Sequence, residues 1–121
     1  MKNKESQEMY LETILKLQKQ NEIVKSIDIA KELNYSRASV SRGIHLLLDS
    51  ELIKMSDDGQ IILTETGLKL SEKIFERHTT LTKALIKIGV EEKSAEENAC
   101  KIEHIISDDV FEKIKDFVNK N

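Results

Sequence analysis

The stretch that decides the fold is SIDIAKELNYSRASVSRGIHLLLDS, which runs from Ser26 to Ser50. Its first third carries one short apolar stripe at helical spacing, made of Ile27, Ala30 and Leu33. Ser26 and Ser36 are each placed to cap a helix, and the dipeptide 34–35 separates the two helical patterns. Two short helices joined by a tight turn are typical of a helix-turn-helix.

The outer face of the second of these helices carries small and basic side chains and no acid before Asp49. The candidate DNA-binding residues on it and beside it are Ser36, Arg37, Ala38, Ser39, Ser41, Arg42 and His45. Small residues allow close approach to a groove, the arginines can pair with phosphate or guanine edges, and the serines can bond phosphate. An ordinary solvated face is the alternative. It is disfavoured because the chain as a whole holds more acids (22) than bases (19).

The flanking segments extend this unit to a winged helix-turn-helix. A helix is predicted over 6–19, and two short strands, 52–55 and 60–63, surround a Ser-Asp-Asp-Gly turn. We therefore predict a mainly α protein with an N-terminal winged-helix DNA-binding domain over residues 1–63.

The rest of the chain, residues 64–121, is predicted to hold a long linker helix over 64–88 and two more helices, 94–106 and 110–118. Ser107 is the expected cap of the last one. Two helices cannot bury so many apolar side chains alone, so we predict a helical dimerisation unit that forms a two-fold homodimer through these C-terminal helices.

Composition and charge limit the fold class, the cell compartment and the binding partners that the chain can have. The absence of proline and the low aromatic content favour helices, and a single cysteine suits a reducing cytosol. No apolar run could span a membrane and no signal-peptide core is visible, so we expect a cytoplasmic protein. Residues 1–55 hold nine bases and eight acids, whereas residues 56–121 hold ten bases and fourteen acids. Nucleic acid should therefore meet the first half, and a cation the second.

The pentapeptide CKIEH, residues 100–104, suggests where a cation binds. On a helix, offsets of three and four residues place Cys100, Glu103 and His104 on one face. The alternative is a small buried thiol beside a solvated Glu-His pair. Met9 and Glu12 are likewise three residues apart on the first helix, where the alternative is a core methionine beside a solvated carboxylate.

Several segments taken together resemble the diphtheria-toxin-repressor family of iron- and manganese-dependent transcription regulators. They cover nearly the whole chain in the correct order: MYLETI (9–14), SIDIA (26–30), SVS (39–41), LTETG (63–67), Arg77-His78 and ACKIEHIISD (99–108). The resemblance implies a short member without the C-terminal SH3-like domain. It also implies a metal-dependent repressor in which a divalent metal locks the dimer in a DNA-binding arrangement on a palindromic operator of metal-homeostasis genes.

The resemblance also implies a ligand set. Met9, Cys100, Glu103 and His104 match the activating site of the iron-responsive branch, and this donor set favours Fe²⁺, with Mn²⁺ as the alternative. His78 matches a ligand of the ancillary site, but Thr82 and Glu96 stand where that site needs a carboxylate and a histidine. A hybrid second site from Glu12, His78 and Glu103 stays open.

Three other readings are open. The first is a metal-independent winged-helix transcription regulator, in which Cys100, Glu103 and His104 are packing and surface. The second is a metal-dependent enzyme with Glu103 as base, but no H-E-x-x-H or nucleophile-base set is present, so we predict no enzyme. The third is a helical interaction module, against which the acid-free helix face argues.

Overall fold

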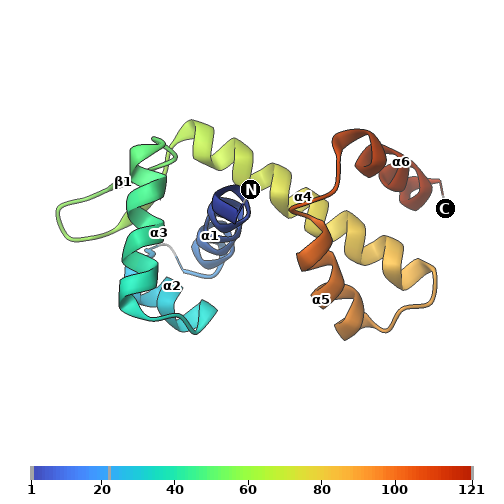
Figure 1. Ribbon diagram of the computed structural model, residues 1–121, viewed down its shortest axis with the longest axis horizontal. Helices are drawn as coiled ribbons and strands as arrows, with labels where there is room; N and C mark the ends of the chain where they lie inside the picture. The colour runs from blue at the N-terminus through green and yellow to red at the C-terminus, as the bar shows by residue number, and fades with distance from the viewer. Residues whose placement is uncertain (1, 22, 121) are drawn as a thin grey trace. The chain divides into compact units, whose positions relative to one another are not determined.

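The computed structural model describes residues 2–21 and 23–120. The chain order is α1 (Lys2–Gln20), α2 (Ser26–Leu33), α3 (Arg37–Asp49), β1 (Ile53–Met55), β2 (Ile61–Leu63), α4 (Glu65–Lys87), α5 (Glu92–Ile102) and α6 (Asp108–Asn119). The predicted mainly α fold with a winged helix-turn-helix is confirmed (Figure 1). Within the described residues, no helix combines the length and the apolar character that crossing a bilayer would require.

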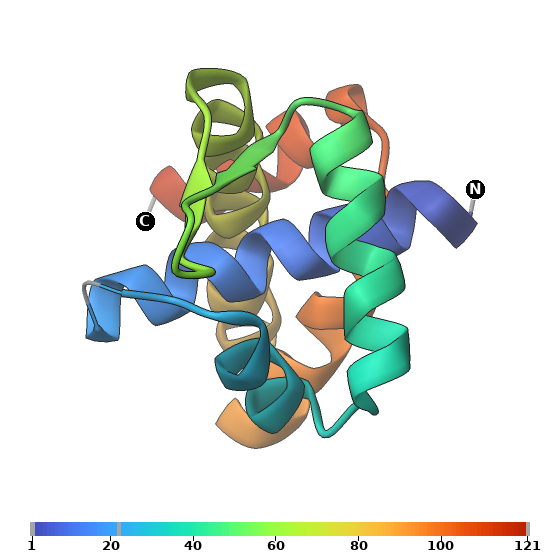
Figure 2. The ribbon, with the colours of Figure 1, turned by 90° about the vertical axis from the view of Figure 1, so that its left-hand side faces the viewer.

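The chain forms two compact units, residues 1–72 and 73–121, and each is described by itself. In unit 1, α2, α3 and the β-hairpin pack around α1 and lie in front of it in the view of Figure 2. Its core is apolar and fully enclosed, with zero exposure at Leu11, Ile14, Ile29, Leu47 and Ile61. The apolar side chains that recur at helical spacing on α1 therefore form the surface against which the helix-turn-helix packs.

The caps of the helix-turn-helix match the prediction in part. Ser36 is the N-cap of α3, and its Oγ accepts a hydrogen bond from the Ser39 amide at 3.1 Å. Ser26 was expected to cap α2, but it is the first helical residue. Lys25 is the N-cap instead, and its amide donates to the Asp28 carboxylate at 2.8 Å, which satisfies the helix end without a serine.

The wing is a two-stranded antiparallel hairpin in which Ile53 pairs with Leu63 and Met55 with Ile61. Each strand is one residue shorter than predicted. The hairpin is tied to the segment after α1, because the Ile61 amide donates to the Val24 carbonyl at 2.8 Å. Buried Ile53 and Ile61 then fix the hairpin on the core of unit 1.

The long helix α4 begins where the sequence predicts. Thr64 accepts a hydrogen bond from the Gly67 amide at 3.1 Å, and it donates to the Glu51 carbonyl at 2.8 Å. A side chain at Gly67 would collide with the Leu52 carbonyl, so glycine allows the helix to start against the hairpin. The boundary between the units falls inside α4, after Glu72.

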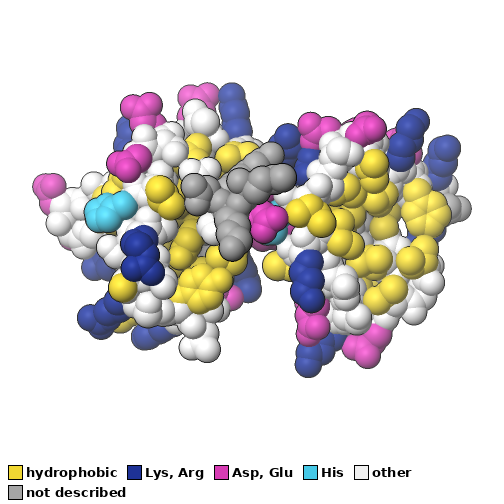
Figure 3. Space-filling model, in the orientation of Figure 1, with side chains coloured by type: hydrophobic (Ala, Val, Ile, Leu, Met, Phe, Trp, Pro, Cys, Tyr) yellow, Lys and Arg dark blue, Asp and Glu magenta, His cyan; other side chains and the backbone are white. Residues whose placement is uncertain are grey.

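Unit 2 consists of the rest of α4 with α5 and α6. Helix α5 ends at Ile102, earlier than the predicted 106, and α6 begins at Asp108. The Ser107 hydroxyl donates to the Asp109 carboxylate at 2.6 Å and holds the pKa of that group below its usual range. Figure 3 shows hydrophobic side chains gathered on the face of this unit that is turned toward the viewer.

Candidate metal centre and nucleic-acid interface

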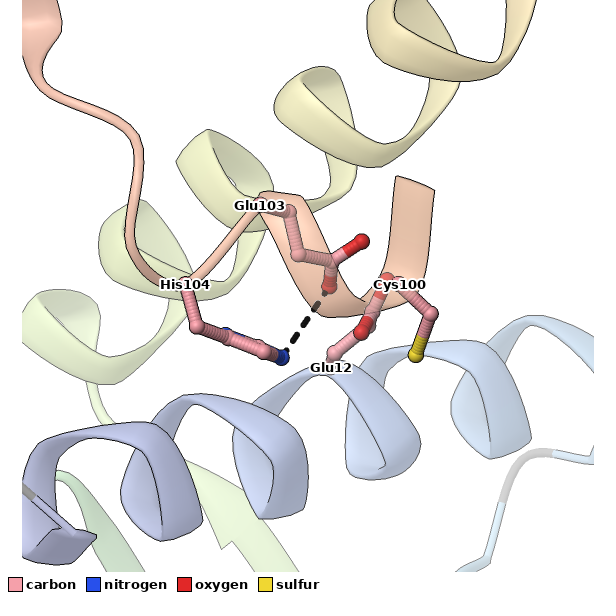
Figure 4. A group of neighbouring side chains, drawn as sticks. All are labelled: Glu12, Cys100, Glu103 and His104. Carbon is pink, nitrogen blue, oxygen red and sulfur yellow. Dashed lines mark ion pairs between the residues drawn. The ribbon is translucent and has the colours of Figure 1, made fainter. Parts of the chain in front are cut away.

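The last turn of α5 and the residue after its cap bring three metal-competent side chains together. The donor atoms of Cys100, Glu103 and His104 lie within 4.8 Å of one another (Figure 4). Glu103 is the C-cap of α5 and keeps a helical bond from its amide to the Ala99 carbonyl at 2.9 Å. The convergence predicted from helical spacing is thus present, although His104 stands beyond the end of the helix.

Glu103 is the centre of this group and has no exposed surface. One carboxylate oxygen is 2.7 Å from Nδ1 of His78 on α4, and the other is 3.4 Å from Nε2 of His104. That second oxygen, Oε2, has no hydrogen-bond partner among the residues that the structure describes. A buried carboxylate is costly unless a cation or donors compensate its charge. Carboxylate, imidazole and thiol therefore fit a divalent cation here.

Arg77 holds the turn that carries these candidate ligands. Its guanidinium donates to the Glu103 carbonyl at 3.2 Å, to the Ile106 carbonyl at 2.8 Å and to the Asp108 carboxylate. The guanidinium carbon is also 5.5 Å from the centroid of the Phe111 ring. Since only 10% of the Arg77 side chain is exposed, the bonds to the two carbonyls form away from most of the solvent, whereas the Asp108 side chain is 74% exposed. They connect α4 to the end of α5 and the start of α6.

The two candidate ligands on α1, Met9 and Glu12, are one turn apart and partly buried. The Met9 sulfur accepts a hydrogen bond from the Tyr35 hydroxyl at 3.6 Å. Figure 4 also labels Glu12, which belongs to unit 1, whereas the other side chains drawn there belong to unit 2. The grouping of the α1 donors with Cys100, Glu103 and His104 stays a prediction.

The exposed face of α3 is free of acids in its first turn. Arg37, Ala38, Ser41, Arg42 and His45 are all exposed. The hydroxyls of Ser36 and Ser39 are bonded to each other at 3.0 Å, and Arg42 donates to the Ser39 Oγ at 3.3 Å. Two of the predicted phosphate-binding hydroxyls are therefore already used in the cap and beside it, while the basic side chains remain open to solvent.

A groove of about 520 Å³ runs along one side of α3. Its apolar floor includes Ala30, Val40 and Ile44, and no acid is among the described residues that line it. Arg37 and His45 stand among its lining residues, with Met55 from the wing. The guanidinium of Arg37 places a positive charge beside this groove, as contacts to phosphate require.

A second groove, of about 350 Å³, lies within unit 2 and is almost entirely apolar. Its lining residues come from α4, α5 and α6: Leu81, Ala84, Leu85, Ile88, Ile102, Lys113, Ile114 and Phe117. Ile88 is 66% exposed and Phe117 is 42% exposed. Exposed apolar surface of this kind is typical of sites that contact another protein or a ligand.

Family models match both halves of the chain. Residues 3–61 match the iron dependent repressor N-terminal DNA binding domain, and residues 64–121 match the iron dependent repressor metal binding and dimerisation domain. An uncharacterized HTH-type transcriptional regulator of Methanocaldococcus jannaschii is 35% identical over 118 residues, which are 96% of this chain and 94% of that protein. The chain belongs to the diphtheria-toxin-repressor family.

The chain is also similar to an iron-dependent repressor and to a manganese regulator. The iron-dependent repressor IdeR of Mycobacterium tuberculosis is 28% identical over 113 residues, which are 93% of this chain and 49% of that protein. The structure of the manganese regulator SloR superposes with a TM-score of 0.84 at 25% identity and covers 95% of this chain and 54% of that one. The chain thus spans about half the length of these relatives.

Two residues that touch candidate ligands were not predicted from the sequence of this family member. Arg77 appeared only as the neighbour of His78, and Tyr35 only as a break between two helices. The contacts of each bridge 26 residues of sequence, so local spacing could not reveal them. At the ancillary positions, the Thr82 hydroxyl donates to the His78 carbonyl at 2.7 Å, and Glu96 is exposed on α5.

Proposed function

We propose that this protein is a metal-dependent transcriptional repressor in which a divalent cation, held by side chains from both units, selects the arrangement that binds DNA. The observation that carries this proposal is the buried Glu103 carboxylate, which lies between two imidazoles beside Cys100 and has one oxygen without a hydrogen-bond partner among the described residues. Family membership supports the same assignment.

Cys100, Glu103 and His104 would supply the donors of unit 2, and Met9 those of unit 1. The bound cation would supply bonds to both units and so restrict their relative orientation. If the metal-free units sample many orientations and DNA accepts few, DNA affinity rises by a coupling of typically ~1–3 kcal/mol. By reciprocity, DNA tightens the binding of metal by the same factor.

The donor types favour Fe²⁺. Imidazole suits Fe²⁺, Co²⁺, Ni²⁺ and Zn²⁺, while a thioether and a thiol or carbonyl bias the site against Mn²⁺. His78 orients Glu103 through their 2.7 Å contact. A second ion held by Glu12, His78 and Glu103 is the alternative arrangement, which favours Mn²⁺ because it adds a carboxylate. The number of ions bound per chain distinguishes the two.

The proposed DNA contact is the acid-free face of α3, with Arg37 and Arg42 pairing with phosphates or guanines and the flanking groove receiving a backbone strand. The proposed dimer contact is the apolar groove of unit 2. A two-fold dimer binds a palindromic operator whose half-sites are one helical turn, or a multiple of it, apart.

The test is DNA binding with and without metal. Duplexes are selected from a random pool in the presence of Fe²⁺ under reducing, anaerobic conditions, and binding is then measured in excess chelator and with Fe²⁺, Mn²⁺ or Zn²⁺ added. Metal should tighten binding by about 5- to 150-fold. Glu103→Gln should abolish this increase, whereas Glu97→Gln, an exposed neighbour on α5, should keep it.

Binding that ignores the chelator would instead favour the metal-independent winged-helix regulator. Because that alternative keeps the same α3 face, it also predicts weaker DNA binding on Arg42→Ala. The two candidate functions therefore give different predictions only for DNA binding in excess chelator and for the effect of Glu103→Gln on the metal response.

The dimer has its own test. Ile114→Glu places a charge in the apolar groove of unit 2 and should give monomers in sedimentation analysis. Ile23→Glu is the matched control, because Ile23 is 54% exposed in unit 1 and should leave the dimer intact. Monomeric wild-type protein would contradict the proposed assembly.

A further inference from the structure

Tyr35 stands between a candidate metal ligand and the recognition helix. It occupies the turn between α2 and α3, directly before the Ser36 cap. Asn34 adopts a left-handed backbone there, with φ of 57°, and the Tyr35 amide donates to the Ala30 carbonyl at 3.1 Å. The backbone of Tyr35 is therefore fixed, and its ring is directed from a defined position toward α1.

The ring is packed from a second side. Tyr10, the neighbour of Met9 on α1, meets Tyr35 edge to face with centroids 6.4 Å apart. The Tyr10 hydroxyl donates to the Ser39 carbonyl of α3 at 3.2 Å, and burial raises its pKa. A side chain at Gly43 would collide with the Tyr10 ring, so α3 lies directly against it. Met9 is thus connected to the first turn of α3 through Tyr35 and Tyr10.

The Tyr35 hydroxyl donates a hydrogen bond to the Met9 sulfur, and the oxygen–sulfur distance is 3.6 Å. A thioether is a weak hydrogen-bond acceptor, and it is also a ligand for soft cations. When the sulfur gives a lone pair to a cation, it loses electron density and accepts a hydrogen bond less well. The hydrogen bond and metal coordination therefore weaken each other.

From this geometry we infer that Tyr35 competes with the metal for the Met9 thioether, and that metal binding releases the Tyr35 hydroxyl at the N-terminal end of the recognition helix. The inference rests on the proposed function, because it assumes that Met9 is a ligand. It makes Tyr35 a positioning residue that lowers metal affinity in the free protein.

Tyr35→Phe tests the competition because it removes one oxygen and keeps the packed ring. Zn²⁺ affinity is measured without DNA, by competition with a chromophoric chelator. The variant should bind Zn²⁺ about two- to fivefold more tightly, since a hydrogen bond at the weak end of the usual net range is no longer lost on coordination. Tyr10→Phe is the matched control, because it is the other tyrosine of the chain and its hydroxyl bonds to Ser39. It should leave the Zn²⁺ affinity unchanged.

A second readout follows the sulfur itself. The chain has three methionines, so methyl-labelled protein gives three methionine signals, and Met9→Leu identifies one of them. That signal should move on Tyr35→Phe without metal and should move again when Zn²⁺ is added. In the Met9→Leu background, Tyr35→Phe should no longer change Zn²⁺ affinity.

The outcomes separate this inference from the function on which it rests. If Zn²⁺ moves the Met9 signal but Tyr35→Phe leaves affinity equal or weaker, the competition is wrong and the metal site stands. If Zn²⁺ binds without moving the Met9 signal, Met9 is not a ligand, and the inference falls with it. If the wild-type protein binds no Zn²⁺, Fe²⁺ or Mn²⁺, the proposed function itself is contradicted.

Discussion

On α3 most candidate functional side chains lie in solvent, whereas at the end of α5 Glu103 and His104 are largely buried against one another and only Cys100 is exposed among the three candidate ligands there. Arg37 and Arg42 are exposed, but Glu103 has no exposed surface and the His104 side chain is 10% exposed. Exposed charges act through the field around them and are screened by salt. Buried donors act only when several contacts are in place at once. Substitutions in the two regions should therefore differ in the size of their effects on metal and DNA binding, and in how strongly salt changes those effects.

The largest effect is expected from the buried region. His104→Ala removes a proposed ligand, so metal affinity should fall by more than about 100-fold, beyond what loss of a supporting contact causes. The stimulation of DNA binding by metal should disappear, while binding in chelator and the dimer stay as in the wild type. Calorimetric metal titration together with DNA binding measures both. Metal stimulation at wild-type strength would remove His104 from the site.

An intermediate effect is expected at Arg77, which supports the candidate ligands without being one of them. Arg77→Met breaks bonds to the Glu103 and Ile106 carbonyls and to Asp108. Metal affinity should fall about 10-fold, and the free energy of unfolding should fall by about 1–3 kcal/mol. Lys115→Met removes the 2.9 Å ion pair with Glu76, which lies in solvent in the same unit, and serves as the control. Equal effects of the two substitutions would mean that Arg77 does not position the ligands.

The smallest effect on metal binding is expected from the exposed region. Arg42→Ala should weaken DNA binding and lower the slope of log affinity against log salt by about 1 if Arg42 meets a phosphate, or cost about 1–3 kcal/mol at one base pair if it meets a guanine. Metal affinity of the free protein should not change. Binding over a salt series measures the first quantity and a metal titration the second. If Arg42→Ala lowered metal affinity in the absence of DNA, α3 and the metal site would not act independently.

The same contrast explains how much could be predicted from the sequence. The cap at Ser36 and the acid-free face of α3 depend on residues a few positions apart, so local spacing was enough. The α5 helix was expected to reach residue 106, but it ends at Ile102. The carbonyls of Glu103 and Ile106 accept from Arg77 on α4 instead of from a next helical turn.

The supporting contacts of the candidate ligands were equally hidden. His78 approaches Glu103 across 25 residues of sequence, and Tyr35 approaches Met9 across 26. Spacing and family resemblance predicted which residues would hold metal, but packing between helices decides which residues hold those candidate ligands in place. That part of the site required the fold.

The central claim is that bound metal ties the two units into one orientation. Residual dipolar couplings of backbone amides measure this, since each unit reports its own alignment. Without metal, the residues of unit 1 and unit 2 should fit two alignment tensors of different magnitude, and one equivalent of Zn²⁺ should bring both to a single tensor. Glu103→Gln should keep the metal-free pattern. A single tensor already present in chelator, or two tensors that persist at saturating Zn²⁺, would contradict the account.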